Sequence, residues 1–202
     1  NTYNMLRLTK LLYTTSADPH YMDYYERALY NHILSTVNPI QGGFVYFTPM
    51  RSGHYRVYSQ PQTSFWCCVG SGMENHARYG EMVYSHKGDS ELFVNLFIPS
   101  VLKWGKTTVE QINSFPSEEG TTLVISPEKA RKFTVSIRVP EWAGNVAVKV
   151  NGAEADAKAE GGFLKVTRKW SKGDKVEVSL PMSIRAVPLP DQSDNYSFMY
   201  GP

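Results

Sequence analysis

The chain has 202 residues, of which 42% are hydrophobic and 13% aromatic, which is enough apolar material for one large domain or two modest ones. Its 21 basic and 19 acidic residues leave a net charge of +2 without a run of like charge, which argues against a nucleic-acid partner. No stretch of about 20 apolar residues is present, so no membrane-spanning helix is predicted. The chain contains 13 tyrosines, which is an unusually large number for its length. Such rings suit a cleft of mixed polarity, although core packing is the commoner use of any one tyrosine.

Two helices are predicted at the start of the chain. The first spans residues 2 to about 15, and its apolar positions share one face: Met5, Leu8, Leu11 and Leu12. The second begins with Asp18 as its N-cap and Pro19 at the first helical position. Its apolar positions recur every three or four residues: Met22, Tyr25, Leu29 and Ile33. The two helices are expected to pack as an antiparallel pair, with Asp23 and Arg27 spaced for a surface ion pair.

Between residues 38 and 62, glycine and proline are interspersed among aromatic residues, which indicates short extended pieces and loops. Loops of this kind on a helical scaffold often line binding sites. A third helix is predicted from about Gly72 to His86, and its apolar side would hold Met73, Ala77, Met82 and Val83. Cys67 and Cys68 would then lie just before this helix or in its first turn.

After residue 91 the hydrophobic period falls to two, which is typical of strands with one buried face. The alternating positions are Phe133, Val135, Ile137 and Val139, then Val146, Val148 and Val150, then Val176, Val178 and Leu180. Turn signals separate them at residues 151–152, 161–162 and 172–174. The pattern predicts an antiparallel sandwich of seven to nine strands, with the boundary to the helical part near residues 86–91.

Cys67 and Cys68 are the only cysteines of the chain. The Cα atoms of neighbouring residues lie about 3.8 Å apart, short of the roughly 4.4 to 6.8 Å of an unstrained disulfide. Both are therefore expected to be free thiols, which fit a reducing compartment better than an oxidising one. Backbone N–H groups at a helix start stabilise a thiolate, and two adjacent thiolates can reach one soft metal ion such as zinc.

Two sulfurs do not complete a tetrahedral zinc site. Further donors in the chain would be Glu74, His76, His54 and Glu81, although none has a recognised metal-binding spacing from the cysteines. For Glu74 the more ordinary expectation is that it caps the start of the third helix. From the residues alone, buried structural thiols, a metal or catalytic site, and redox chemistry all stay open, with redox disfavoured because a C-x-x-C motif is absent.

The residues around the cysteines form a specific motif, Phe65-Trp66-Cys67-Cys68 followed by Gly70-Ser71-Gly72-Met73-Glu74. Further segments accompany it at residues 1–6, 24–31, 137–143, 150–152 and 170–174. Together they resemble the β-L-arabinofuranosidase family, glycoside hydrolase family 127 and its close relatives. The resemblance covers essentially the whole chain.

This resemblance implies an α+β multidomain fragment in which the last helices of an (α/α)6 barrel are followed by an antiparallel β-sandwich. Residues 1–90 would form the C-terminal part of the catalytic barrel, and residues 91–202 a jelly-roll-like sandwich. The chain opens without an initiating Met inside a predicted helix, so it is expected to be a piece of a longer protein. A homodimer is one assembly that the full-length protein could adopt.

The resemblance also implies roles for individual residues. In the family the first cysteine of the pair is the nucleophile and both cysteines bind zinc, which makes Cys67 nucleophile and ligand and Cys68 a ligand. The other two ligands, in a Glu-x-Cys element, and the acid/base glutamate would lie upstream of Asn1. Ser71 stands where many members have threonine. Tyr46 and Tyr58, in the loop segment before the motif, are expected to contact the sugar.

The implied reaction is retaining hydrolysis of an arabinose-containing oligosaccharide or glycan. Zinc would keep Cys67 ionised, the thiolate would attack the anomeric carbon, and water would then release the sugar. The chain alone would be inactive and would bind zinc weakly. Two other readings stay open, a non-catalytic carbohydrate-binding or structural sandwich with a helical appendage, and a thiol redox or structural-zinc module. The former leaves the paired cysteines unexplained.

Overall fold

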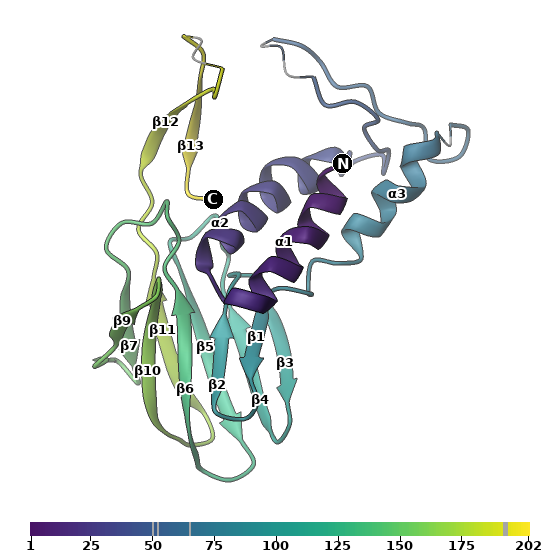
Figure 1. Cartoon of the computed structure of the whole chain (residues 1–202). Coiled ribbons are helices and arrows are strands. Elements are labelled where there is room, and N and C mark those ends of the chain that lie inside the picture. The colour runs from purple at the N-terminus through teal and green to yellow at the C-terminus, as the bar shows by residue number, and fades with distance from the viewer. Residues whose placement is uncertain (50, 52, 65, 192–193) are drawn as a thin grey trace.

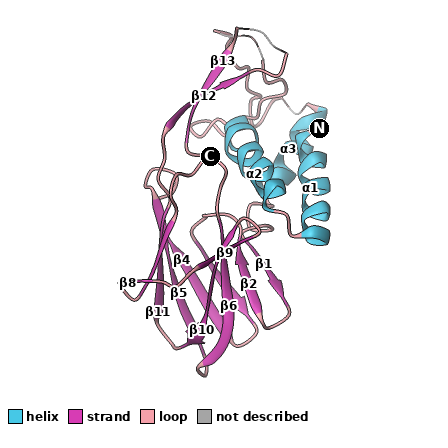
Figure 2. Ribbon diagram, turned by 60° about the vertical axis from the view of Figure 1, so that its left-hand side comes forward, coloured by secondary structure: helices cyan, strands magenta, loops and turns pink. Residues whose placement is uncertain are grey.

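The computed structural model describes residues 1–202 apart from residues 50, 52, 65 and 192–193, so Phe65 of the cysteine motif lies outside the described residues. The chain folds into a group of helices, a β-sandwich and a two-stranded hairpin that projects beyond the sandwich (Figure 1). The helices and the hairpin lie at the same end of the sandwich (Figure 2). Among the described residues, no helix is long and apolar enough to cross a bilayer.

The helical elements are α1 (Thr2–Ser16), α2 (Pro19–Ala28), a π-helical turn (Leu29–Ile33), a 3-10 turn (Leu34–Thr36) and α3 (Cys67–His76). Asp18 caps α2 as predicted, because its carboxylate accepts a hydrogen bond of 3.0 Å from the backbone N–H of His20. Ala17, in the left-handed conformation with φ of 54°, reverses the chain after α1. The two predicted helices and their antiparallel pairing are thus confirmed (Figure 1).

The buried face is predicted correctly for α2 and wrongly for α1. All four apolar positions of the second helical segment are buried: Met22, Tyr25, Leu29 and Ile33. In α1 the buried residues are Leu6, Thr9 and Tyr13, whereas the predicted face is 40–65% exposed. Tyr13 decides the orientation because its hydroxyl donates a 2.7 Å hydrogen bond to Asn95 Oδ1, just after strand β2 (Glu91–Val94).

The third helix begins and ends earlier than predicted. It spans Cys67–His76 instead of about 72–86, and residues 84–87 form strand β1. Met82 and Val83 are both buried at 2% exposure, but they lie in the turn that leads into β1 and not on a helical face. Because adjacent apolar residues fit either period, the sequence pattern did not distinguish the two readings.

The sandwich consists of two sheets. The five-stranded sheet contains, in spatial order, β1 (Tyr84–Lys87), β2 (Glu91–Val94), β6 (Arg131–Arg138), β10 (Phe163–Trp170) and β9 (Lys158–Glu160). The six-stranded sheet contains β3 (Ser100–Trp104), β4 (Thr107–Ile112), β5 (Gly120–Pro127), β11 (Asp174–Ser179), β7 (Ala147–Val150) and β8 (Ala153–Glu154). The separate hairpin pairs β12 (Ile184–Pro188) with β13 (Tyr196–Tyr200).

Two details of the sandwich differ from the prediction. Ten strands of the sandwich, β2 to β11, fall within the described part of residues 91–202, instead of seven to nine. The additional strands include β8 and β9, which have two and three residues and therefore carry no period that a sequence pattern can show. The pairing is antiparallel except between β2 and β6, which run parallel.

The core lies between the two sheets, where most of the predicted alternating positions are buried; Val139 and Val146 are the exceptions, since they lie outside the strands and are half-buried. Phe133, Val135 and Ile137 of β6 are at most 2% exposed and face Val176 and Val178 of β11 within one cluster of buried residues. Burial of each such side chain contributes about 1.5–3 kcal/mol relative to exposure. The predicted turn at residues 151–152 has φ values of 53° and 80°, which suits a two-residue hairpin loop.

A buried polar network joins the helices to the sandwich. Arg138, at the end of β6, is fully buried; its Nη2 lies 2.6 Å from Glu26 Oε1, and its Nε donates to the carbonyl of Asn95 at 2.6 Å. The second carboxylate oxygen of Glu26 accepts a 2.7 Å hydrogen bond from Trp142 Nε1. These bonds fix α2 against the sandwich.

Asp23 belongs to the same network. Its Oδ1 pairs with Arg138 Nη1 and accepts the backbone N–H of Glu141 at 3.1 Å. Asp23 therefore faces the sandwich instead of forming the predicted surface ion pair with Arg27. Local spacing could not show this, because the partner lies 115 residues further along the chain.

Candidate active site around Cys67 and Cys68

The first turn of α3 carries both cysteines, as predicted. Trp66 is its N-cap residue, with extended backbone angles of φ −74° and ψ 157°, and no side chain caps the helix start. The backbone N–H groups of the first turn point along the axis past the helix start, where they and the helix dipole favour negative charge. The position suits an ionised sulfur.

The two thiols are free and solvent-exposed, and their sulfurs lie 3.7 Å apart. Two sulfurs bound to one tetrahedral zinc ion at about 2.3 Å each would be separated by about 3.8 Å. The spacing of Cys67 and Cys68 therefore fits two adjacent corners of a zinc tetrahedron. It also excludes a disulfide between them, whose sulfurs would lie about 2.05 Å apart.

Tyr46 approaches the first of these sulfurs. Its hydroxyl oxygen lies 3.3 Å from Cys67 Sγ. Hydrogen bonds from Tyr46 and then from Cys68 lower the pKa of the Cys67 thiol below its ordinary value, since they stabilise the thiolate. The same contact favours the protonated phenol and raises the pKa of Tyr46 to about 12. The contact thus favours the protonated form of Tyr46 and the thiolate form of Cys67.

Cys67 and Tyr46 open onto a cavity of about 710 Å³. Its lining is mainly aromatic or apolar and consists of Tyr46, Phe47, Pro49, His54, Tyr55, Val57, Trp66 and Cys67. Phe47 and Tyr55 are 78% and 73% exposed. Tyr46 contacts Phe47 and Trp66 edge-on, at centroid distances of 4.5 and 6.0 Å. Such faces suit the C–H side of a sugar ring.

The two tyrosines expected to contact sugar therefore have different places. Tyr46 lies beside Cys67, whereas Tyr58 is not among the residues that line the cavity and forms an isolated bridge with Val45. Phe47 and Tyr55 were not singled out from the sequence. The density of aromatic residues between positions 44 and 58 was the signal that could have identified them.

The loop that carries Tyr46 depends on a close backbone crossing. A Cβ atom placed on Gly43 would lie 2.0 Å from the carbonyl oxygen of Ser59. The backbone N–H of Ser59 also donates a 2.8 Å hydrogen bond to the carbonyl of Phe44. Because residue 43 is glycine, the backbone segments at Gly43 and Ser59 can lie in direct contact, three residues before Tyr46.

The other candidate metal donors do not gather at the sulfurs. Glu81 binds Lys10 and Arg78, and the Nδ1 of His76 is bonded to the hydroxyl of Tyr79. His54 lines the cavity, but its Nδ1–H donates to the carbonyl of Tyr55 at 2.9 Å. Within the described residues, no group of three or more His, Cys, Asp or Glu side chains is placed to hold a metal ion.

Glu74 does not cap the start of α3, because it lies in the last turn of the helix Cys67–His76. The prediction that Glu74 caps the helix start is therefore wrong, and the reason is the shift of the helix start from residue 72 to residue 67. Its side chain is exposed.

Comparison with known proteins gives matches for both parts of the chain. The family model of the GH127 β-L-arabinofuranosidase catalytic domain matches residues 1–81, and that of the GH127 middle domain matches residues 91–182. No curated protein sequence matches the chain.

Solved structures match over the whole chain. A GH127 β-L-arabinofuranosidase from Geobacillus stearothermophilus T6 is 25% identical with a TM-score of 0.82, covering 98% of this chain and 34% of that one. A GH127 β-arabinofuranosidase is 26% identical with a TM-score of 0.83, covering 99% and 35%. A glycoside hydrolase at 21% identity and a TM-score of 0.85, covering 99% and 36%, shares the fold. The chain thus spans about a third of the length of these proteins.

These matches confirm the predicted fold class, the end of a helical barrel followed by a β-sandwich. The helical part, with the paired cysteines, corresponds to the catalytic domain, and the sandwich corresponds to the middle domain. The chain belongs to the GH127 β-L-arabinofuranosidase family.

Proposed function

We propose that this chain is part of a retaining glycoside hydrolase that releases L-arabinofuranose or a related sugar from plant glycans, with Cys67 as the nucleophile. Residues 1–90 would contribute to the catalytic domain and residues 91–202 would form the sandwich that supports it. One observation carries the proposal: Cys67 Sγ lies 3.7 Å from Cys68 Sγ and 3.3 Å from the Tyr46 hydroxyl, at the wall of an aromatic cavity.

The chemistry of the donor set supports a zinc site here. Cys67 and Cys68 would supply two sulfur ligands, which the 3.7 Å spacing fits. When bound, zinc would hold both sulfurs deprotonated at neutral pH. The remaining ligands would have to come from outside the described part of this chain, since no third donor lies with the two cysteines there.

In the proposed reaction, the Cys67 thiolate donates an electron pair to the anomeric carbon of the sugar. A carbon–sulfur bond forms while the bond to the glycosidic oxygen breaks, and an acid outside this chain protonates the departing alcohol. Water then attacks the same carbon while the conjugate base of that acid takes the water's proton. The carbon–sulfur bond breaks, which releases the sugar and restores the thiolate. Each of the two displacements inverts the configuration of the anomeric carbon, so the released sugar has the configuration that it had in the substrate.

Tyr46 and the aromatic lining have supporting parts in this proposal. Tyr46 would orient the sulfur by donating its O–H, and its high pKa keeps that proton in place. Trp66 and Phe47 flank Tyr46 and would exclude water from the sulfur while offering apolar faces to the sugar ring.

The test uses the longer protein that contains this chain, assayed with an aryl β-L-arabinofuranoside. Cys67→Ser is expected to lower kcat by about 10³-fold or more, whereas Tyr58→Phe, outside the cavity, is the matched control and should retain activity. NMR of the first-formed sugar should show the β anomer. Turnover that survives in Cys67→Ser, or an inverted anomer, contradicts the proposal. A wild-type protein that binds the glycoside without cleaving it favours a binding module.

A further inference from the structure

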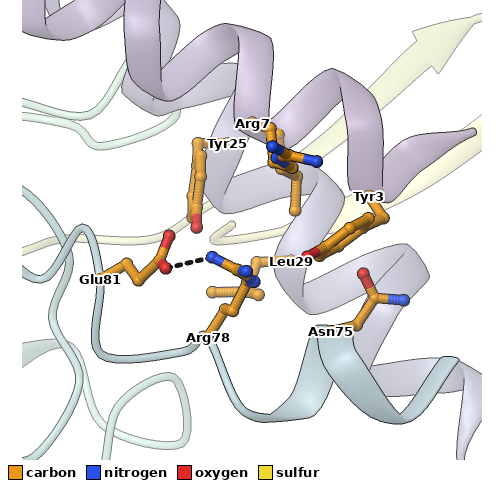
Figure 3. A pocket seen from close by; sticks show the side chains of 8 residues that line it. Tyr3, Arg7, Tyr25, Leu29, Asn75, Arg78 and Glu81 are labelled. Atoms are coloured by element: carbon orange, nitrogen blue, oxygen red, sulfur yellow. Dashed lines mark hydrogen bonds and ion pairs between the residues drawn. The ribbon is translucent and has the colours of Figure 1, made fainter. Parts of the chain in front are cut away.

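Helix α3 presents both cysteines at one end and is attached to the other helices at the opposite end. Asn75 in its last turn, with Arg78 and Glu81 just beyond it, lines a small cavity of about 10 Å³ shared with α1 and α2 (Figure 3). Phe44 packs against the last residue of α3, where its ring centroid lies 5.4 Å from that of His76. Phe44 lies on a loop, so this contact does not fix α3 to α1.

Arg78 is the centre of the attachment. Its guanidinium binds the carboxylate of Glu81, and its Cζ lies 5.4 Å from the ring centroid of Tyr3 on α1 (Figure 3). The other oxygen of Glu81 accepts a hydrogen bond of 3.1 Å from Lys10, also on α1. The segment after α3 therefore contacts α1 at two points, through Tyr3 and through Lys10.

These contacts can fix the angle between α3 and α1 while adding little to the free energy of folding. The side chains of Lys10, Glu81 and Arg78 are 38%, 27% and 40% exposed, so water screens their attraction. A helix of ten residues is about 15 Å long, so a tilt of about 4° at the Arg78 end would displace the cysteine end by about 1 Å. Displacements of this size at a reacting atom are costly in rate.

We propose that Arg78 is a positioning residue, which acts through Tyr3 and Glu81 to fix the angle at which α3 presents Cys67 and Cys68. Its effect on turnover rests on the proposed function, but its effect on the angle of α3 does not. Arg78 touches neither sulfur and has no chemical part in the reaction.

The direct test measures the position of α3 in the full chain. Spin labels are placed at Met73→Cys on α3 and Thr15→Cys on α1, both exposed positions, in a Cys67→Ser, Cys68→Ser background. Arg78→Met should widen the electron–electron distance distribution by about twofold, since a helix released at one end samples more tilts. Arg78→Lys keeps the charge and should restore part of the narrow distribution.

A matched control is Lys106→Met, which breaks an exposed ion pair with Glu128 of 3.6 Å in the sandwich. It should leave the distribution unchanged, and both variants should have midpoints of thermal unfolding close to that of the starting chain. Should Arg78→Met prove too unstable to measure, Glu81→Gln, which weakens the same attachment, takes its place. A distribution in Arg78→Met or Glu81→Gln as narrow as the starting chain's overturns the proposal.

The second arm uses the longer enzyme. Arg78→Met should lower kcat by about 10- to 100-fold with little change in KM, and Arg78→Lys should recover part of it. A fall in kcat without any change in the distance distribution also overturns the positioning role. A wild-type enzyme that fails to cleave arabinofuranosides refutes the proposed function alone, and the distance measurement still decides on Arg78.

Discussion

Arg138 and Glu26 form a fully buried ion pair of 2.6 Å that joins the sandwich to helix α2. Burying two charges is costly unless each finds further partners, and here the carbonyl of Asn95 and the indole of Trp142 supply them. The pair fixes the helical part on the sandwich, so loss of one partner leaves an uncompensated charge in the interior.

Arg138→Met should therefore lower the free energy of unfolding by about 3–5 kcal/mol. Urea unfolding followed by tryptophan fluorescence and circular dichroism would measure it. Lys106→Met, which removes an exposed ion pair, should change stability by less than about 1 kcal/mol. An Arg138 variant as stable as this control would show that the buried pair does not hold the two parts together.

Tyr46→Phe should slow alkylation of Cys67 at neutral pH. The hydroxyl of Tyr46 lowers the pKa of the thiol by stabilising the thiolate, so its removal raises that pKa and reduces the thiolate fraction at any pH near neutrality. Iodoacetamide labelling of the metal-free chain between about pH 6 and 9, with fragment-ion assignment of Cys67, would follow the shift. Tyr58→Phe is the matched control, and identical pH profiles for the two variants would rule out the effect.

Zinc should bind the 202-residue chain weakly, because only two sulfur donors come together in its described part. A four-ligand structural site binds zinc with a free energy of about 10–16 kcal/mol. With half of the donors, the affinity should be low enough for a chelator to remove the zinc. Competition with a chromophoric chelator would measure it, and Cys68→Ser should weaken binding further. One equivalent of zinc that survives the chelator would contradict the two-donor site.

Gly43→Ala should displace the loop that carries Tyr46, because the new Cβ would lie 2.0 Å from the carbonyl oxygen of Ser59. We expect a loss of about 1–3 kcal/mol and slower alkylation of Cys67 at neutral pH. Gly80→Ala is the matched control, since no atom lies within 4 Å of its added Cβ. Equal alkylation rates in the two variants would disprove the tight crossing.

Local signals predicted local features well. The capping of α2 by Asp18 and the apolar face that includes Met22 depend on residues within a few positions of each other, and both are confirmed. The alternation of Phe133, Val135 and Ile137 likewise predicted strand β6. In each case the periodicity of the element and its tertiary environment favour the same side chains for burial.

Features set by distant partners were not predictable in this way. The orientation of α1 depends on a bond from Tyr13 to Asn95, 82 residues away, and the inward turn of Asp23 depends on Arg138. At the site, no local pattern distinguishes Tyr46 from Tyr58. Only the folded loop, which crosses itself at Gly43, places one beside Cys67.

The proposed function requires a covalent bond between the sulfur of Cys67 and the sugar. Rapid quenching of the longer enzyme with an arabinofuranoside that has a good leaving group, followed by peptide mass spectrometry, tests it most directly. We expect a transient adduct of one pentosyl residue on Cys67 and none on Cys68. An adduct on a carboxylate or on Cys68, or steady turnover by Cys67→Ala, would contradict it.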